Sequence, residues 1–161
     1  SGPKLTCWTS KVSPDMIQTT TVSITGTESR PRYPKRVIGN LIDGIYGRTM
    51  DECFLSLYSA NPYVLFDFGN SRIIKNVFVR GQNSANIAIH FEKIEVRIGN
   101  ITSSGQFQNY QLIGKFEGPT KIVDLEVKFG DGIREWAGRF VSIQMMVSVG
   151  IEMQICHVEI Y

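Results

Sequence analysis

Two alternating segments close the chain: GRFVSIQ at residues 138–144 and ICHVEIY at residues 155–161. In and just after the first segment, apolar and polar side chains alternate, with Val141, Ile143 and Met145 opposed to Ser142 and Gln144. A period of two is typical of a β-strand that has one face buried. The first segment therefore predicts a strand whose aliphatic side chains point into a core.

The second segment also alternates, and it contains a cysteine. By the same reasoning, we expect Ile155 and His157 on one side of a strand, with Cys156, Val158 and Ile160 on the other. A cysteine inside a C-terminal strand suggests a disulfide that ties the end of the chain into a sheet.

Strand-like segments also dominate the rest of the chain. They are short apolar runs separated by clusters of Gly, Pro and Asn, at residues 63–68, 73–80, 90–98, 110–116 and 121–129. Inside one of them, Ile94, Val96 and Ile98 alternate with charged residues. The pattern predicts an all-β protein, either a sandwich or a barrel.

The composition limits the class of protein. A chain of 161 residues that is 42% hydrophobic suits one domain with a full core. We assign residues 4–161 to this domain, and residues 1–3 to a protease-cleavage scar from recombinant expression. The net charge is +2 without a basic stripe, so nucleic acid is not an expected partner. Prolines interrupt the basic cluster between Arg30 and Arg36, which favours a solvated loop.

Three cysteines and one sequon bear on the compartment. An odd cysteine count in a secreted chain implies one disulfide and one cysteine that is free or bonded elsewhere. Asn100-Ile101-Thr102 is an acceptor for N-glycosylation in a predicted loop. Together these features favour an extracellular glycoprotein or a cell-surface ectodomain. No run of 18 apolar residues is present, so a transmembrane helix is not expected.

The chemically active side chains do not form an enzyme motif. The two histidines, His90 and His157, lie in none of the short spacings typical of zinc sites. Neither a nucleophile elbow nor a phosphate-binding glycine loop is present in the sequence. We interpret His90 as a surface or edge residue, and we expect that the protein is not an enzyme and has no catalytic residues.

Two loops could bind a ligand. The first runs from Asn40 to Glu52 and carries Asp43 and Asp51, so it could offer hard oxygens to calcium or form a solvated acidic loop. The second follows Arg80, which is predicted to end a strand. An arginine beside the amides of residues 81–86 suits sugar hydroxyls, whereas the structural alternative is an ion pair at the base of the loop. Trp136 either anchors the core or stacks on a ligand.

These pieces together resemble the galactose-binding-like jelly roll, whose branches include discoidin domains and F-type lectins, or fucolectins. The resemblance is nearer to the F-type lectins. It covers residues 33–161 through five motifs in the family's order: NLIDG at 40–44, NPYVLFDFG at 61–69, IIKNVFVR at 73–80, GRFVSI at 138–143 and CHVEIY at 156–161. The resemblance implies a galactose-binding-domain-like jelly-roll β-sandwich that recognises carbohydrate.

The resemblance also implies a disulfide. In F-type lectins, a cysteine after the calcium loop pairs with the cysteine of the last strand, which corresponds to Cys53–Cys156. Discoidin domains instead join the two chain ends, which would pair Cys7 with Cys156. We favour the first pairing, which leaves the partner of Cys7 open.

A structural calcium ion is a further implication of the resemblance. The family's ion is held by loop carbonyls and carboxylates that correspond here to Asn40, Asp43, Glu52 and the vicinity of Cys156. His157 stands where a glutamate ligand is usual.

The family's fucose site is altered in this chain. Arg80 matches the first arginine of that site, but Leu55 replaces its histidine and Gln82 replaces its aspartate. Ordinary fucose binding is therefore not expected. We expect a ligand at the loop end formed by Arg48, Arg80, Gln82 and Asn83.

Two functions follow from this reading. The first is a lectin-like module with a non-standard site that binds a glycan or a cell-surface glycoprotein. The alternative is a protein-adhesion or receptor-interaction domain that keeps the lectin fold without binding sugar. Binding to a membrane surface through the apolar residues Tyr46, Met50 and Ile87 is less favoured.

Overall fold

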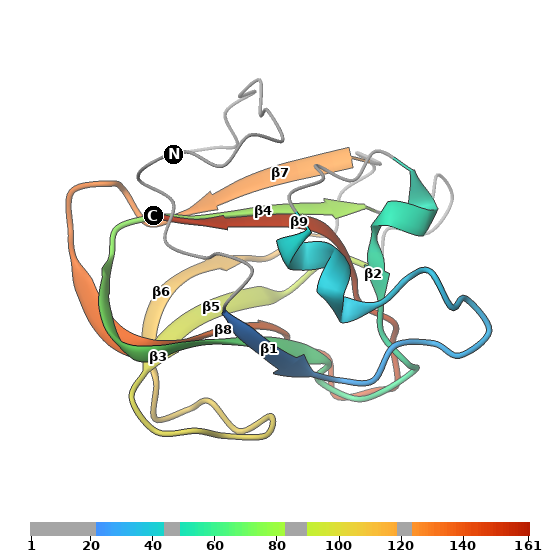
Figure 1. Cartoon of the computed structure of the whole chain (residues 1–161), viewed down its shortest axis with the longest axis horizontal. Helices are drawn as coiled ribbons and strands as arrows, with labels where there is room; N and C mark the ends of the chain where they lie inside the picture. Colours follow the sequence, from blue (N-terminus) through green and yellow to red (C-terminus); the bar gives the residue numbers. More distant parts are fainter. Residues whose placement is uncertain (1–21, 44–48, 83–89, 119–123) are drawn as a thin grey trace.

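The computed structural model describes residues 22–43, 49–82, 90–118 and 124–161. Within these residues, nine strands form two antiparallel sheets that lie one above the other, as Figure 1 shows. Two short 3-10 helices, η1 (Ile38–Ile42) and η2 (Met50–Glu52), complete the described elements. In this part of the chain, no helix has the length and apolar character needed to cross a membrane. The predicted all-β sandwich is confirmed.

The larger sheet has five strands. Their order is β1 (Ser23–Gly26), β3 (Tyr63–Ile74), β8 (Trp136–Met145), β5 (Ile94–Gly99) and β6 (Gln111–Phe116). The smaller sheet forms the upper layer in Figure 1, in the order β2 (Phe54–Leu55), β9 (Gln154–Ile160), β4 (Val77–Gln82) and β7 (Asp124–Phe129).

The boundary between β3 and β4 differs from the sequence prediction. Two strands were expected at residues 63–68 and 73–80, but β3 continues through an irregular pairing after Asp67 as far as Ile74. The chain turns at Lys75 and Asn76, whose amides donate to the backbone oxygen of Tyr161 at 2.6 and 3.1 Å. Strand β3 therefore ends at Ile74, just before the residues that donate to Tyr161, and not at Gly69.

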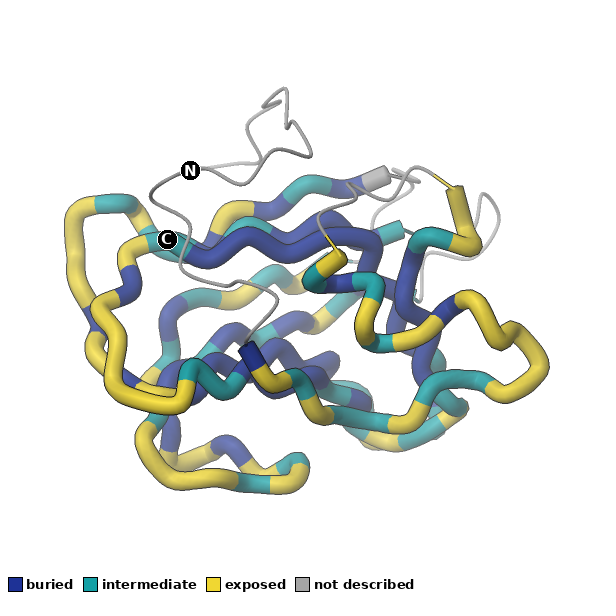
Figure 2. The backbone as a smooth tube through the Cα atoms, viewed as in Figure 1, coloured by how far each residue is buried: buried dark blue, intermediate teal, exposed yellow. Residues whose placement is uncertain are grey.

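The core fills the space between the two sheets, where Figure 2 shows mostly buried backbone. Val141, Ile143 and Met145 of β8 are all 0% exposed. A fully buried aliphatic side chain of this kind stabilises the fold by about 1.5–3 kcal/mol relative to an exposed one. The alternation predicted for this segment is confirmed. Trp136 also belongs to the core, and the structure thereby selects one of its two predicted roles.

The last strand departs from simple alternation. Arg80 of β4 pairs with His157, whereas Gly81 pairs with Ile155, so Cys156 is an extra residue in β9. Such a β-bulge breaks the period of two. As a result, Ile155 lies in the core together with Val158, and the prediction that it shares a side with His157 is wrong.

A disulfide joins this bulge to the chain just before β2. Cys53 and Cys156 are bonded and are separated by 103 residues in the sequence. Closing a segment of that length stabilises a fold by about 2–5 kcal/mol. The pairing implied by the resemblance to F-type lectins is confirmed, while Cys7 lies outside the described residues.

The outward face of the five-stranded sheet is covered by the segment that joins β5 to β6. Phe107 and Tyr110 of this segment pack with Leu65 and Phe140 in a second, smaller apolar cluster.

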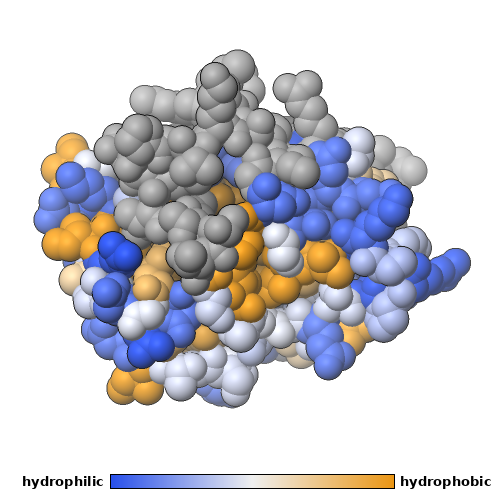
Figure 3. Space-filling model, in the orientation of Figure 1, coloured by the Kyte–Doolittle hydropathy of each residue, from blue (hydrophilic) through white to orange (hydrophobic). Residues whose placement is uncertain are grey.

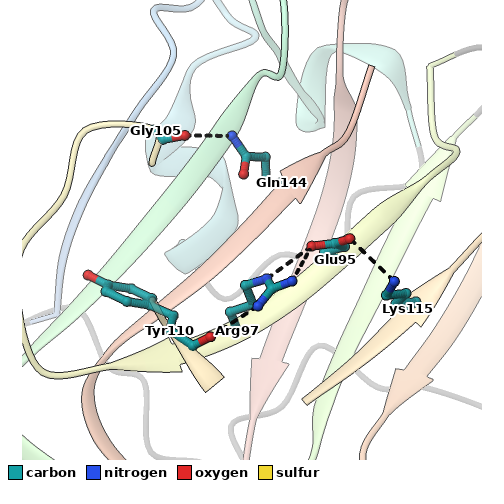
Figure 4. Close-up of polar contacts among 6 residues, drawn as sticks. All are labelled: Glu95, Arg97, Gly105, Tyr110, Lys115 and Gln144. Carbon is teal, nitrogen blue, oxygen red and sulfur yellow. Dashed lines mark hydrogen bonds and ion pairs between the residues drawn. The ribbon is translucent and has the colours of Figure 1, made fainter. Parts of the chain in front are cut away.

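The polar side of β8 is consequently buried as well. Gln144 Nε2 donates to the backbone oxygen of Gly105 at 3.0 Å, and Arg97 Nη2 lies 2.9 Å from Glu95 Oε1. Figure 4 shows both contacts. The protein's own groups therefore occupy much of this face.

The open side of the sandwich is closed by η1. In Figure 3, hydrophobic surface runs along the middle of the face shown, between hydrophilic regions. Leu41 is 2% exposed, and Ile38 and Ile42 pack against the core while partly buried. The helix thus shields the core at this edge and positions the segment that leads to η2 and β2.

Candidate functional site

A polar pocket of about 230 Å³ lies beside β2, where β9 begins. Its walls come from the loop between β1 and η1, from η2 and β2, and from the chain entering β5 and β9. The lining residues are Arg30, Tyr33, Arg36, Met50, Leu55, His90, Glu152 and Gln154. Most of these side chains can donate or accept hydrogen bonds, so the pocket suits a polar ligand.

Backbone hydrogen bonds around Leu55 fix the pocket. Leu55 pairs with Gln154 across β2 and β9. Its backbone oxygen accepts from the amide of Arg30 at 3.1 Å, and its amide donates to the backbone oxygen of Arg36 at 3.2 Å. The loop that carries both arginines is therefore held against the sheet at two points.

Arg36 is the most buried cation of the pocket, with 3% of the residue exposed. Its Nε donates to the backbone oxygen of Cys53 at 3.3 Å, but its buried Nη2 has no hydrogen-bond partner among the described residues. Burial lowers the pKa of Arg36, although the charges of Asp51 and Glu152 oppose that shift. The prediction of a solvated basic loop is wrong for Arg36, because this side chain is buried and donates to the backbone of Cys53.

The second arginine of the pocket is paired. Arg30 Nη1 lies 2.6 Å from Glu152 Oε1, and both side chains are partly exposed. His90 Nδ1 lies 3.0 Å from the backbone oxygen of Glu152. His90 is thus a half-buried pocket residue, and the interpretation as a surface or edge residue missed this contact.

Gln154 links the pocket to the residues predicted from the sequence. Its Nε2 donates to Gln82 Oε1 at 2.8 Å, and the same oxygen lies 3.9 Å from Cys53 Sγ. Gln82 therefore packs beside the disulfide, next to the pocket. Of the other predicted ligand-binding residues, Arg48 and Asn83 lie outside the described residues.

Arg80 does not end its strand. It is the fourth residue of β4, is 4% exposed and lies opposite Glu126 on β7 and His157 on β9. The strand continues because Gly81 and Gln82 still pair with β7. Replacing Arg80 is therefore expected to disturb the sheet as well as any ligand site.

Burial in this part of the sheet also affects the pKa values of two acids, Glu126 and Glu159. Burial raises the pKa of Glu126, and the charge of Glu159 raises it further. Burial has the same effect on Glu159, but hydrogen bonds from His157 and Tyr161 outweigh it, so the pKa of Glu159 is lowered. His157 Nε2 lies 3.0 Å from Glu159, and this contact belongs to a buried polar network.

The residues proposed for calcium surround η1 and η2. Asn40 Nδ2 donates to the backbone oxygens of Lys35 at 2.9 Å and Asp51 at 3.3 Å, which ties the two short helices together. Asp43 follows η1 and is exposed, and Glu52 ends η2 and is half-buried.

The oxygen-rich side chains of this segment fit the ligand preference of calcium. The side chain of Cys156 is committed to the disulfide, however, and the described residues contain no group of three or more His, Cys, Asp or Glu that could hold a metal ion. Residues 44–48 lie outside the description, so calcium stays a prediction.

The predicted glycosylation site lies at the other end of the five-stranded sheet. Asn100 is exposed immediately after β5 and borders a second hollow of about 570 Å³. The hydroxyl of Tyr110 donates to the backbone oxygen of Ile101, which holds the sequon in this segment. Exposure makes Asn100 accessible to modification, which stays a prediction.

Alternation just before the last strand would have indicated two of the pocket residues. Ile151, Met153 and Ile155 are buried, whereas Glu152 and Gln154 between them line the pocket. This period of two extends the last strand pattern backwards and would have grouped the two polar residues on one side.

Comparison with known proteins places the fold. No protein-family model matches the chain, and no curated protein matches it. A fucolectin from the serum of striped bass (Morone saxatilis) has a TM-score of 0.70 at 17% identity, over 92% of this chain and 47% of that chain. A fucose-binding module of Streptococcus pneumoniae has a TM-score of 0.68 at 11% identity, over 94% and 99%.

A third similar structure is a mutant lectin domain of lectinolysin, which was solved with Lewis b. Its TM-score is 0.65 at 14% identity, over 93% of this chain and 97% of that chain. The chain thus spans about half of the striped bass lectin and nearly all of the two other domains. Its fold is the galactose-binding-like jelly roll of F-type lectins and fucose-binding modules, as the five motifs implied.

Proposed function

We propose that this domain is an extracellular carbohydrate-recognition module without catalytic activity, which binds its ligand in the pocket beside β2. The observation that carries the proposal is the pocket itself, a concave polar site in a fold whose solved neighbours include lectins and fucose-binding modules. The disulfide supports an oxidising compartment, because such bonds persist mainly in secreted and cell-surface proteins.

The chemistry of the lining supports a saccharide. Arginine and glutamine present several donors in a fixed arrangement, and tyrosine adds a hydroxyl and a ring face. The volume of about 230 Å³ is smaller than the roughly 300–1,000 Å³ of pockets that enclose drug-sized ligands. The pocket therefore suits one sugar ring at the end of a glycan, bound weakly because few atoms offset the cost of association.

The site differs from the family's fucose site. Leu55 lines the pocket where the family has a histidine, and Arg80 is buried within the sheet instead of lying at a loop base. A ligand would instead meet Arg36, Gln154 and the pair formed by Arg30 and Glu152. We therefore propose a non-standard saccharide specificity.

A glycan array followed by NMR titration tests the proposal. Titrating the domain with the best saccharide should shift the amide signals of residues 30–36, 54–55 and 152–154. Gln154→Ala should weaken binding about tenfold, since one buried hydrogen bond is lost. The matched control is Gln111→Ala, which alters an exposed glutamine at the second hollow.

Two outcomes would contradict the proposal. Signals that shift only around the second hollow would move the binding site to the other end of the sheet. An array without any saccharide signal, combined with silent titrations, would favour the protein-adhesion function.

We also propose a calcium ion beside the pocket, with oxygens of Asn40, Asp43 and Glu52 among its ligands. The ion would act structurally by holding the segment between η1 and η2. The support for this proposal is the hydrogen bond from Asn40 to the backbone of Asp51, which already brings the two ends of the segment together.

A further inference from the structure

We propose that the pocket beside β2 selects acidic saccharides, with a carboxylate or sulfate of the sugar bound against Arg36. This inference rests on the proposed carbohydrate-binding function and specifies its class of ligand. It departs from neutral fucose, the sugar named for the solved structure of the Streptococcus pneumoniae module.

The first argument is the incomplete bonding of Arg36. A buried charge is costly unless it is paired and hydrogen-bonded. Arg36 is 3% exposed, its Nη2 has no hydrogen-bond partner, and it forms no ion pair with any residue that the structure describes. An acidic group in the pocket would supply a compensating charge, and a small shift of the Arg36 side chain would let it accept from Nη2, which is shielded from solvent in the free protein.

The second argument is the balance of charge around the pocket. Arg30 and Arg36 both line it, but the lining carboxylate of Glu152 is already committed to Arg30 at 2.6 Å. Asp51 and Glu152 act on Arg36 only through their charges, without a hydrogen bond or ion pair among the described contacts. One cation of the lining therefore remains without an ion-pair partner among the described residues.

The third argument concerns the strength of the bond. A neutral hydroxyl could also accept from Nη2, but a bond between an arginine and a carboxylate or sulfate is roughly twice as strong as a neutral one. Because Arg36 is buried, its charge is poorly solvated in the free protein, and its pKa is lowered. An anion would gain more from this position than it gains from a solvated arginine.

Three matched sugars test the inference: galactose, galacturonic acid and galactose 6-sulfate. They share one ring and differ only at its sixth carbon, so they separate neutral, carboxylate and sulfate chemistry. We expect at least one acid to bind about tenfold more tightly than galactose in NMR titrations, with shifts around Arg36, Leu55 and Gln154. The two acidic arms identify which acid the pocket prefers.

Charge-matched variants then locate the selective group. Arg36→Met should abolish the preference for acid, whereas Arg139→Gln removes an equal charge from an exposed pair with Asp67 and should preserve it. Because Arg36 also holds the backbone of Cys53, its variant is checked by thermal melting. Gln154→Glu provides a second variant that keeps Arg36 in place; it removes the amide donor for every sugar, and by repulsion it should weaken the acidic sugars more than galactose.

The outcomes separate this inference from the proposed function. Equal affinity for all three sugars at the pocket would overturn the acidic selectivity and leave carbohydrate binding intact. Binding of the acids that neither Arg36→Met nor Gln154→Glu reduces would also overturn it. The absence of binding by any saccharide, on the array and in titrations, would overturn both proposals.

Discussion

Asp67 shows how one side chain can link two distant sequence motifs. Its Oδ1 accepts from the amide of Gly69 at 2.8 Å, and its two carboxylate oxygens accept from Arg139 Nε and Nη2 at 2.8 and 3.1 Å. Gly69 has a φ of +80°, a backbone conformation that glycine adopts without strain. The FDFG and GRF motifs, noticed in the sequence only as fold markers, are thus in direct contact.

Asp67→Asn should reduce stability at neutral pH but not in strong acid. The hydrogen bond from Arg139, as the largest cause, lowers the pKa of Asp67 below its ordinary value. A carboxylate with a lowered pKa stabilises the fold above its unfolded pKa of about 3.9, and the stabilisation is lost as the pH falls through the folded pKa.

Urea unfolding of both proteins between pH 7 and pH 2 measures this effect. The difference in unfolding free energy should shrink as the pH falls through the lowered pKa of Asp67, and it should be much smaller at neutral pH when Arg139→Gln is present in both proteins, which leaves only the contribution of the Gly69 amide. A difference that stays constant with pH would show that Asp67 acts through packing and not through its charge.

Burial and pairing of individual polar residues were the hardest features to predict. Arg36 follows prolines and basic residues, which favour a solvated loop, but the backbone of Leu55 in β2 holds this loop at Arg30 and Arg36, and the Arg36 side chain is buried. Arg80 was expected at a strand end because glycine follows it. Gly81 instead continues the strand by pairing with β7, and its lack of a side chain leaves room for Phe91.

At the scale of elements, prediction succeeded where the register is regular. In β5 and β8 the predicted aliphatic side chains pack between the two sheets, although Ser142 and Gln144 on the outer side of β8 are buried too. The period of two fails in β9, where every residue is buried and Cys156 adds a bulge. Neither feature is visible locally, since both depend on the neighbouring strand and on the disulfide.

Two glycine variants test how tightly these elements pack. A Cβ at Gly81 of β4 would lie 2.2 Å from the ring of Phe91, whereas a Cβ at Gly39 of η1 meets nothing within 4 Å. Gly81→Ala should therefore lower the free energy of unfolding by about 1–3 kcal/mol, as overpacking usually does. Gly39→Ala is the matched control and should be neutral or slightly stabilising.

Denaturant unfolding of the two variants gives the comparison. Equal stability of Gly81→Ala and Gly39→Ala would mean that Phe91 moves aside without cost. The close approach of β4 to Phe91 would then not restrict position 81 to glycine.

At the scale of the whole molecule, the sandwich brings four distant segments to one end. The loop after β1, the segment from η1 to β2, the chain before β5 and the start of β9 all meet at the pocket. The sequence predicted the fold that unites them, but among the groups nearby it identified only Leu55, Gln82 and the Asn40–Glu52 segment as belonging to a site. His90 and Glu152 belong to no sequence motif. They line the pocket and contact each other only because the fold brings their segments together.

The proposed calcium ion would stabilise the whole molecule, because the segment that it holds contributes Met50 to the pocket and Cys53 to the disulfide. An ion that binds only the folded state stabilises it by about 2.7 kcal/mol at 100 times its dissociation constant. For a domain of this size, that corresponds to a rise of roughly 5–10 °C in melting temperature.

We therefore expect the domain to melt several degrees higher in millimolar calcium than in EDTA. Asp43→Asn should remove the difference, since it replaces an exposed carboxylate of the segment with a neutral amide. Asp131→Asn should preserve it, because Asp131 caps a turn after β7 by accepting from the amides of Ile133 and Arg134. Superimposable melting curves, with no metal found by elemental analysis, would eliminate the ion and leave the disulfide and Asn40 to hold this end of the sandwich.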